Sequence, residues 1–285
     1  MSKQPLYLIT LSCPDRTGIV ADVGRFLVDK GCNIVESAQY GDRQNGRFFM
    51  RTSFHSLESQ DLASLEAAFA SVAARFEMDA RFFDLAAPVR TLLMVSKLGH
   101  CLNDLLFRHR IGAIPLDVRA IVSNHGDFAS QAEHDGIPFH VLPVTAETKA
   151  EAEQKLIELI ESEEIELIVL ARYMQVLSEA FCARYPGRII NIHHSFLPSF
   201  KGAKPYHRAH DRGVKLIGAT AHYVTSDLDE GPIIEQGVER VAHNRSPNDL
   251  VAIGRDVESV VLARAVQWHA EHRVLLNGHR TVVFP

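Results

Sequence analysis

The chain has 285 residues, of which 46% are hydrophobic and 23% charged, as in a globular protein with a sizeable core and room for two domains. Its formal charge of -5 argues against a general nucleic-acid or acidic-membrane binder, since such proteins carry a basic surplus. The four cysteines (Cys13, Cys32, Cys101 and Cys182) form no CxxC pair, so the sequence predicts neither a zinc ribbon nor a disulfide framework.

The amino terminus carries only a short apolar run before Asp15. That run is too short for a signal-peptide core or a membrane span. Together with the cysteine usage, it indicates a cytoplasmic protein that contacts neither membranes nor nucleic acid.

Residues 1–86 predict a small domain with the order βαββαβ. Apolar residues recur with helical spacing from Ile19 to Leu27 and again from Leu62 to Phe76, and β-rich runs flank both segments. The predicted strands are Tyr7–Ser12, Asn33–Tyr40, Arg47–His55 and Ala80–Leu85. This order predicts a four-stranded antiparallel sheet backed by two helices, a ferredoxin-like fold.

Residues 87–285 predict a second domain, in which nearly continuous apolar runs alternate with helices. Such runs are typical of parallel strands covered on both faces, so we expect a doubly wound, mostly parallel α/β sheet. Its predicted strands are 91–96, 118–123, 139–144, 165–171 and 188–193. A hairpin-like pair (216–226 and 232–241) and a long helix from Ser246-Pro247 follow.

Polar residues gather where the fifth of these strands ends. Asn191 and His193 are two apart in a strand, so their side chains point to the same side. An amide can donate to a developing oxyanion, and an imidazole can carry a proton near neutral pH. Asp227 and Asp229 lie in a turn after a later strand, and a carboxylate there can orient His193.

The same residues also have ordinary interpretations. A single Asn or His at a strand end is more often a loop hydrogen-bonder, and Asp-Leu-Asp-Glu-Gly is commonly a solvated turn. The abundant histidines show no HExxH pattern or other ligand spacing, so we expect no metal. From residue chemistry alone, an acyl-transfer enzyme is the favoured hypothesis.

The motifs around these residues resemble those of the folate-dependent formyltransferases. They are Asn191-Ile-His193, Ser195-Phe-Leu-Pro198, Gly218-Ala-Thr-Ala-His222 and Asp227-Leu-Asp229-Glu-Gly-Pro. The resemblance implies that Asn191, His193 and Asp229 are catalytic. It also implies that the folate pterin binds two segments: Met174, Gln175, Val176 and Leu177, and Thr225, Ser226, Asp227 and Leu228.

The first domain resembles an ACT domain, through Cys13-Pro-Asp-Arg-Thr-Gly-Ile-Val20 and Gly31-Cys-Asn-Ile34. ACT followed by a formyltransferase-like domain is the arrangement of the 10-formyltetrahydrofolate deformylase family. The segment Ser96–Leu105 carries one glycine, Gly99, and is a poor phosphate cradle, which also favours water over a phosphorylated amine as acceptor.

The family resemblance implies hydrolysis of 10-formyltetrahydrofolate to formate and tetrahydrofolate, which supplies formate for purine and one-carbon metabolism. It implies no cofactor beyond the folate substrate. A formyltransferase to an amine acceptor and a non-catalytic folate or amino-acid sensor are the alternatives. ACT domains commonly pair, so we expect a homo-oligomer with an amino-acid effector, glycine or methionine. Its site would include Asp15, Thr17, Gly18, Ile19, Asn33 and Ile34.

Overall fold

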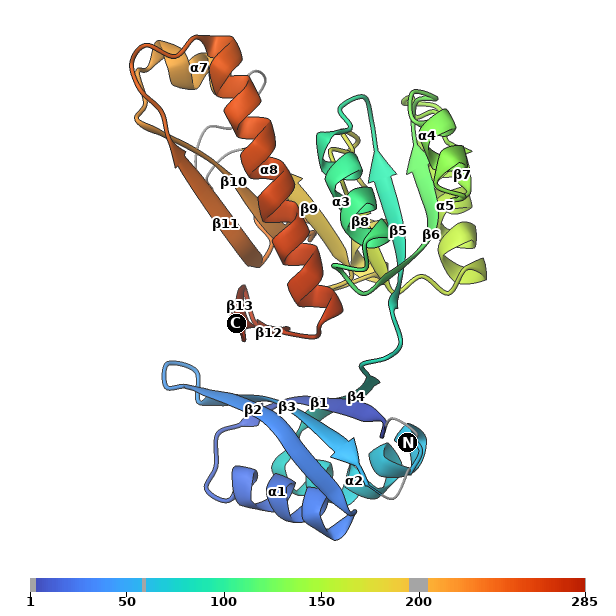
Figure 1. Cartoon of the computed structure of the whole chain (residues 1–285), viewed down its shortest axis with the longest axis vertical. Helices are drawn as coiled ribbons and strands as arrows, with labels where there is room; N and C mark the ends of the chain where they lie inside the picture. The colour runs from blue at the N-terminus through green and yellow to red at the C-terminus, as the bar shows by residue number, and fades with distance from the viewer. Residues whose placement is uncertain (1–3, 58–59, 195–204, 285) are drawn as a thin grey trace. The chain divides into compact units, whose positions relative to one another are not determined.

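The computed structural model describes residues 4–57, 60–194 and 205–284. The chain divides into two compact units (Figure 1). The first contains residues 1–88, 271–277 and 282–285, and the second contains residues 89–270 and 278–281. Among the described residues, no helix combines the length and the apolar character that crossing a bilayer requires.

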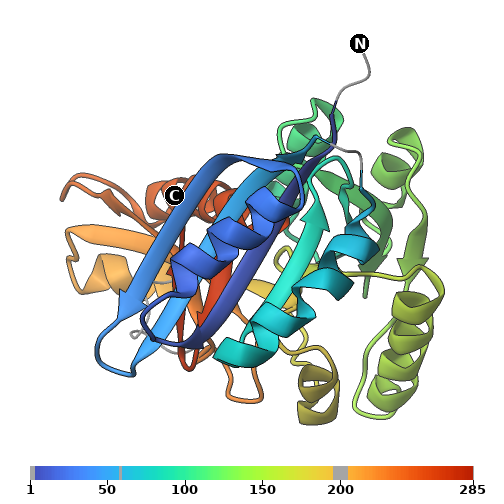
Figure 2. The same cartoon turned by 90° about the horizontal axis from the view of Figure 1, so that it is seen from below.

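The first unit has the predicted βαββαβ order. Its elements are β1 (Leu6–Pro14), α1 (Ile19–Asp29), β2 (Cys32–Asp42), β3 (Arg47–Ser56), α2 (Leu62–Phe76) and β4 (Asp79–Asp84). The antiparallel strands have the spatial order β2-β3-β1-β4. Both helices cover one face of the sheet (Figure 2), where Leu27, Phe54 and Phe69 belong to one buried apolar cluster. The ferredoxin-like prediction is confirmed.

Local signals explain where the two helices of this unit begin and end. Gly18 precedes α1 with φ 99°, a left-handed conformation that favours glycine. Asp61 caps α2 by accepting a hydrogen bond from the Ser64 amide at 2.8 Å. The helix α2 ends at Phe76, and the next residue, Glu77, has a φ of 56° that turns the chain toward β4.

The carboxyl-terminal residues contribute to the first unit by contact, although the sequence assigned all of 87–285 to the second domain. The chain closes with β12 (Val274–Asn277) and β13 (Arg280–Val283). The Asn277 amide donates to the buried Asp42 at 2.7 Å. The ring of His272 stacks on Phe83 with 3.6 Å between centroids, and Arg51 donates to the carbonyl of Glu271 at 3.0 Å. These polar and stacking contacts leave no hydrophobic period in the sequence, which is why the pattern did not reveal them.

The second unit is the predicted doubly wound domain. Its strands are β5 (Val89–Val95), β6 (Leu116–Ser123), β7 (Phe139–Val141), β8 (Leu167–Leu170), β9 (Ile189–His193), β10 (Leu216–Tyr223) and β11 (Ile233–Arg240). Its helices are α3 (His100–Arg110), α4 (Ala129–His134), α5 (Lys149–Ser162), α6 (Glu179–Arg184), α7 (Pro205–Asp211) and α8 (Pro247–Ala270).

The sheet of this unit has the order β11-β10-β9-β8-β5-β6-β7. The five strands from β9 to β7 are parallel, and β10 is antiparallel to both of its neighbours. Side chains of α5 and α6 pack with Leu92, Met94 and Ile189 on one face. The helices α3 and α8 contact each other, and α8 lies along β10 (Figure 1). The mostly parallel, two-sided sheet confirms the prediction.

The strand order reverses between β5 and β8, which is where ligands bind in open α/β sheets. The segments that follow these strands are joined directly: the Ser96 amide donates to the Arg172 carbonyl at 3.2 Å, and the Met174 amide donates to the Ser96 hydroxyl at 3.0 Å. The switch point therefore brings the segment after β8 against the end of β5.

Candidate active site

The strand β9 presents Asn191 and His193 on one face of the sheet. Ile189 of the same strand faces the core beneath α5 and α6, and alternation along a strand places residues two and four positions later on that face. His193 is 9% exposed and Asn191 is half-buried. The strand β9 thus carries both polar groups on one face near its carboxyl end, as the sequence predicted; their catalytic role stays a prediction.

Asp229 pairs with His193, with 3.1 Å between Oδ2 and Nδ1. Hydrogen bonding to His193 holds the pKa of the Asp229 carboxyl well below its ordinary value, although burial acts in the opposite direction. Asp229 accepts the contact from a left-handed conformation, with φ 59°, which Asp tolerates better than most residues.

Gly231 makes this turn possible. A Cβ atom at that position would lie 1.8 Å from the Tyr223 carbonyl oxygen. The Tyr223 amide donates to the Pro232 carbonyl at 2.9 Å, which holds the chain at this close approach. Only glycine allows the chain to return so closely to the end of β10. The close return holds the turn that carries Asp229 beside β9.

His222 lies beside these residues, although the sequence predicts no role for it in the site beyond its place in a family motif. It pairs directly with Asn191 across β9 and β10, so both side chains lie on one face. Its Nδ1 donates to the Tyr223 carbonyl at 2.9 Å, because a carbonyl can only accept. Its Nε2 lies 3.4 Å from Asn191 Nδ2 and 3.8 Å from Asp229 Oδ1.

The shorter of these two contacts defines the role of His222. A neutral ring whose proton is on Nδ1 has a lone pair on Nε2, which accepts from the Asn191 amide. This orients the Asn191 side chain with its NH₂ group toward β10. Alternation along β10 predicts that Thr220 and His222 share a face. Only the register between β9 and β10 shows that His222 lies opposite Asn191.

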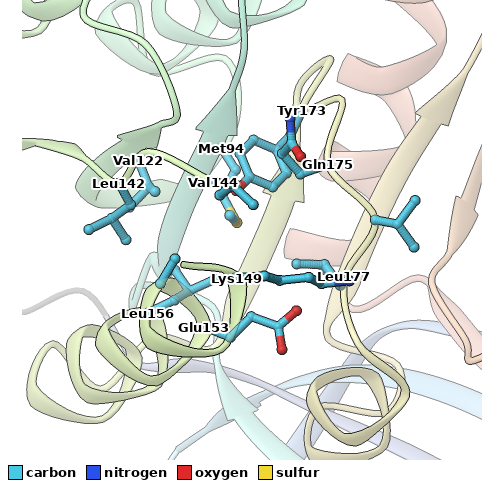
Figure 3. Close-up of a pocket in the computed structure, with 12 residues that line it drawn as sticks. Met94, Val122, Leu142, Val144, Lys149, Glu153, Leu156, Tyr173, Gln175 and Leu177 are labelled. Atoms are coloured by element: carbon cyan, nitrogen blue, oxygen red, sulfur yellow. The ribbon is translucent and has the colours of Figure 1, made fainter. Parts of the chain in front are cut away.

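A pocket of about 310 Å³ lies at the carboxyl ends of β5 and β6 (Figure 3). Of the predicted folate contacts, Gln175, Val176 and Leu177 line it, whereas Met174 and the loop from Thr225 to Leu228 do not. The other lining residues are Met94, Val122, Leu142, Val144, Lys149, Ala152, Glu153, Leu156 and Tyr173. Glu153 also accepts from the Ser178 amide at 2.7 Å, which ties α5 to the segment after β8.

The remaining predicted contacts are partly or fully exposed. Met174 and Leu228 are 57% and 62% exposed, large values for apolar side chains. Thr225 is partly exposed, and Ser226 and Asp227 are exposed. The hydroxyl of Thr225 donates to the Asp227 carbonyl at 3.2 Å, a hydrogen bond within the loop that helps to hold its conformation.

The predicted effector residues lie in the first unit, at two places. Asp15, Thr17 and Gly18 are exposed ahead of α1, and Asn33 and Ile34 are exposed at the start of β2. Ile19 differs, because it is buried in the core of the unit. Its contribution to a ligand site would be to hold the α1 terminus in place.

Among the described residues, His100, Cys101 and Glu258 are the one group whose ligand atoms lie close enough to hold a metal ion. Nε2 of His100 instead donates to Glu258 at 2.8 Å, and Arg172 lies 3.4 Å from the same carboxylate. A guanidinium at that distance disfavours a second cation. The expectation of no metal stays a prediction.

The family models match both units. Residues 7–73 match the ACT domain, and residues 89–266 match the formyl transferase model. The chain therefore belongs to the class in which an ACT domain is joined to a formyl transferase domain.

Similar proteins narrow the class. The formyltetrahydrofolate deformylase of Corynebacterium sp. is 52% identical over 99% of both chains, and that of Bacillus subtilis is 48% identical over 97% of this chain and 93% of its own. The crystal structure of the Burkholderia mallei formyltetrahydrofolate deformylase matches with a TM-score of 0.95 and 53% identity, over 99% of this chain and 100% of that one. The chain belongs to the formyltetrahydrofolate deformylase family.

A more distant structure covers only part of the chain. Glycinamide ribonucleotide transformylase 1 from Symbiobacterium toebii matches with a TM-score of 0.65 and 30% identity, over 70% of this chain and 95% of that one. The similarity to the deformylases extends over both units, whereas the transformylase leaves nearly a third of this chain unmatched.

Proposed function

We propose that this chain hydrolyses 10-formyltetrahydrofolate to formate and tetrahydrofolate, with Asn191, His193 and Asp229 as the catalytic residues. The observation that carries the proposal is how the two ring nitrogens of His193 are placed. Its Nδ1 contacts Asp229 at 3.1 Å, and its Nε2 is buried without a hydrogen-bond partner in the described part of the chain. Such an atom is available to a substrate or a water molecule.

The pairing with Asp229 assigns the proton of His193. The carboxylate accepts from Nδ1–H, so Nε2 of the neutral ring has the lone pair that a general base needs. Nε2 takes a proton from water as the water oxygen bonds to the formyl carbon. Asp229 then stabilises the imidazolium that forms. This arrangement is worth ~10²–10⁴ in rate for general acid–base catalysis.

Asn191 stabilises the other product of the same step. When water adds to the formyl carbon, the carbonyl oxygen becomes an oxyanion that needs a hydrogen-bond donor. One N–H of the Asn191 amide donates a hydrogen bond to His222 at 3.4 Å, which leaves the second N–H for the oxyanion. The intermediate collapses when the C–N10 bond breaks, N10 takes the proton from His193, and formate leaves.

The segment after β5 supports water over a phosphorylated amine as the acceptor. The amino terminus of α3 would be the natural phosphate site, but a Cβ on Gly99 would lie 2.4 Å from Phe128, whose ring covers it. His100 at the same terminus bonds the Glu258 carboxylate at 2.8 Å, and a phosphate there would meet that negative charge.

The pocket of about 310 Å³ beside Tyr173 supports the folate part of the proposal. It is mainly apolar and includes the polar side chain of Gln175, which could bind a polar ring edge, the combination typical of small-molecule sites. We propose that Met174 and the loop from Thr225 to Leu228 cover the substrate from its exposed side.

The ACT unit supports a proposal of regulation. We propose that it binds an amino-acid effector, glycine or methionine, near Asp15–Ile19 and Asn33–Ile34, and that ACT units pair into a homo-oligomer. The strand β2 lies at the edge of the sheet and is exposed over most of its length, a position from which a strand can pair with a second copy of the sheet.

Formate release from 10-formyltetrahydrofolate in plain buffer tests the function. We expect turnover without any acceptor, together with stoichiometric tetrahydrofolate. Turnover that requires an added amine would make the chain a transferase. Substrate binding without turnover under either condition would make it a sensor.

A further inference from the structure

A second set of polar side chains lies on the other side of His193, and the proposed reaction does not use it. Arg172 follows β8, His194 follows β9, and Glu258 lies in α8. The three residues are connected in series. Arg172 Nε lies 3.4 Å from Glu258 Oε2, and Arg172 Nη1 lies 2.9 Å from His194 Nδ1.

Glu258 is the anchor of this series. It is 1% exposed, and it accepts from the Tyr206 hydroxyl at 2.7 Å and from His100 Nε2 at 2.8 Å. Burial raises the pKa of Glu258, but its partners His100, Arg172 and Tyr206 outweigh burial and lower it. Gly254 lies one turn earlier in α8. A Cβ atom at that position would lie 2.2 Å from the Tyr206 ring, so glycine leaves the ring room to reach Glu258. A buried carboxylate that accepts two hydrogen bonds is a rigid counter-ion for Arg172.

Arg172 controls the protonation of His194. A guanidinium has only donors, so the contact at 2.9 Å requires Nδ1 of His194 to accept. A neutral ring with an acceptor at Nδ1 carries its proton on Nε2. Burial first, and then the charge of Arg172, lower the pKa of His194 to about 4. His194 is therefore neutral at the pH at which His193 works.

His194 in turn lies against the proposed base. The rings of His193 and His194 are stacked, with 4.8 Å between centroids and 19° between planes. A charged His194 would place a cation beside His193 in the step in which His193 takes up a proton. When His194 is neutral, the carboxylate of Asp229 is the charged group in direct contact with His193.

We propose that Arg172 and Glu258 are positioning residues, which hold His194 as a neutral, oriented ring against which the His193 base is stacked. The inference rests on the proposed function, because it assigns His193 as the base. The groups that face His194 are Arg172 after β8, His193 in β9, Asp229 in the turn after β10, Tyr206 in α7 and Glu258 in α8. Among these neighbours only Arg172 donates to Nδ1 of His194.

Arg172→Met in the full chain tests the proposal, with kcat and KM for formate release measured from pH 5 to pH 9. We expect kcat to fall about 30- to 100-fold, within the range of general acid–base effects, and KM to change less than about threefold. The loss of the Arg172 cation raises the pKa of His194, so His194 becomes charged at acidic pH. The ratio of wild-type to variant kcat must therefore be larger at pH 5.5 than at pH 8.

A double-mutant cycle with His194→Phe separates positioning from packing. Phe keeps a stacking ring but neither accepts from Arg172 nor titrates. In the His194→Phe background, Arg172→Met should cost less than about threefold in kcat, and the pH-dependent part of its effect should disappear. Equal losses in both backgrounds would show that Arg172 does not act through His194, and would overturn the proposal.

Three further variants serve as a matched control, a test of the proposed base and a replacement for Arg172→Met. Arg188→Met removes an arginine at the other end of β9, where it donates to the Glu166 carbonyl at 3.1 Å, and should leave kcat unchanged. His193→Ala must abolish turnover; full activity there would refute the proposed function itself rather than the positioning role. If Arg172→Met does not fold, Arg172→Gln replaces it, since its amide is polar but removes the cation beside His194, so the same pH-dependent loss is expected. Unchanged kcat and pH profile in the folded variant would also overturn the proposal.

Discussion

Replacing Asp229 with Asn tests the centre of the site with the smallest possible change. Asn has nearly the same shape, but it loses the negative charge that lies 3.1 Å from His193 Nδ1. The backbone should tolerate the change, because Asp229 has φ 59° and Asn is among the residues that adopt the left-handed region most readily. The variant should therefore fold and should bind tetrahydrofolate about as well as the wild type.

The expected loss follows from the charge interaction. An imidazolium and a carboxylate whose charge centres are ~4 Å apart attract by about 4 kcal/mol at an effective dielectric constant of 20. The Asp229 side chain is 21% exposed, so solvent screens the pair only in part. About 4 kcal/mol corresponds to a factor of ~10³ in rate, and this stabilisation is lost when His193 becomes charged in the transition state.

The assay compares formate release with tetrahydrofolate binding for the same preparation. We expect kcat to fall ~10³-fold with a dissociation constant within about threefold of the wild-type value. Glu239→Gln is the control, because Glu239 is an exposed carboxylate in β11, and it should keep full activity. Normal turnover by Asp229→Asn would refute the reasoning, and so would a loss of turnover explained entirely by lost binding.

Three other predictions concern the same turn and strand. Asn191→Ala should lower kcat ~10²–10³-fold with little change in KM, as expected for a lost oxyanion donor, in steady-state kinetics of formate release. Gly231→Ala should lower the free energy of unfolding by about 2–3 kcal/mol in urea titrations, because its Cβ would lie 1.8 Å from the Tyr223 carbonyl oxygen; an unchanged midpoint would contradict the close approach. Since the folded-state pKa of Asp229 is lowered, its stabilisation is present above the unfolded pKa of about 3.9 and is lost as the pH falls below that value. Wild-type stability should therefore decline more steeply than that of Asp229→Asn between pH 4 and pH 2.5, whereas parallel declines would argue against the pairing.

Much of the fold follows from periodicity in the sequence. The two helices of the ACT unit and the buried parallel strands are readable because burial on one or two faces imposes a period on apolar residues. Elements held by polar contacts have no such period. The carboxyl-terminal segment is the example, since Asn277 and His272 attach to the ACT sheet through an amide and a stacked ring.

The same distinction applies to the site. Asn191 and His193 could be predicted together, because two residues on one strand share a face by alternation alone. His222 could not, since its place opposite Asn191 depends on the antiparallel register of β9 and β10. The spacing of residues in the sequence does not predict that register, because a long connection separates the two strands.

The sequence by itself determined the order of elements, the two-domain organisation and the family motifs that contain the proposed catalytic residues. Only the tertiary structure decided which polar groups meet. Arg172, His194 and Glu258 come from three separate elements and act on one another at 2.9 and 3.4 Å. The physical reason is range: backbone periodicity is a local property, whereas hydrogen bonds and charges act between side chains that the packing of the whole sheet brings together.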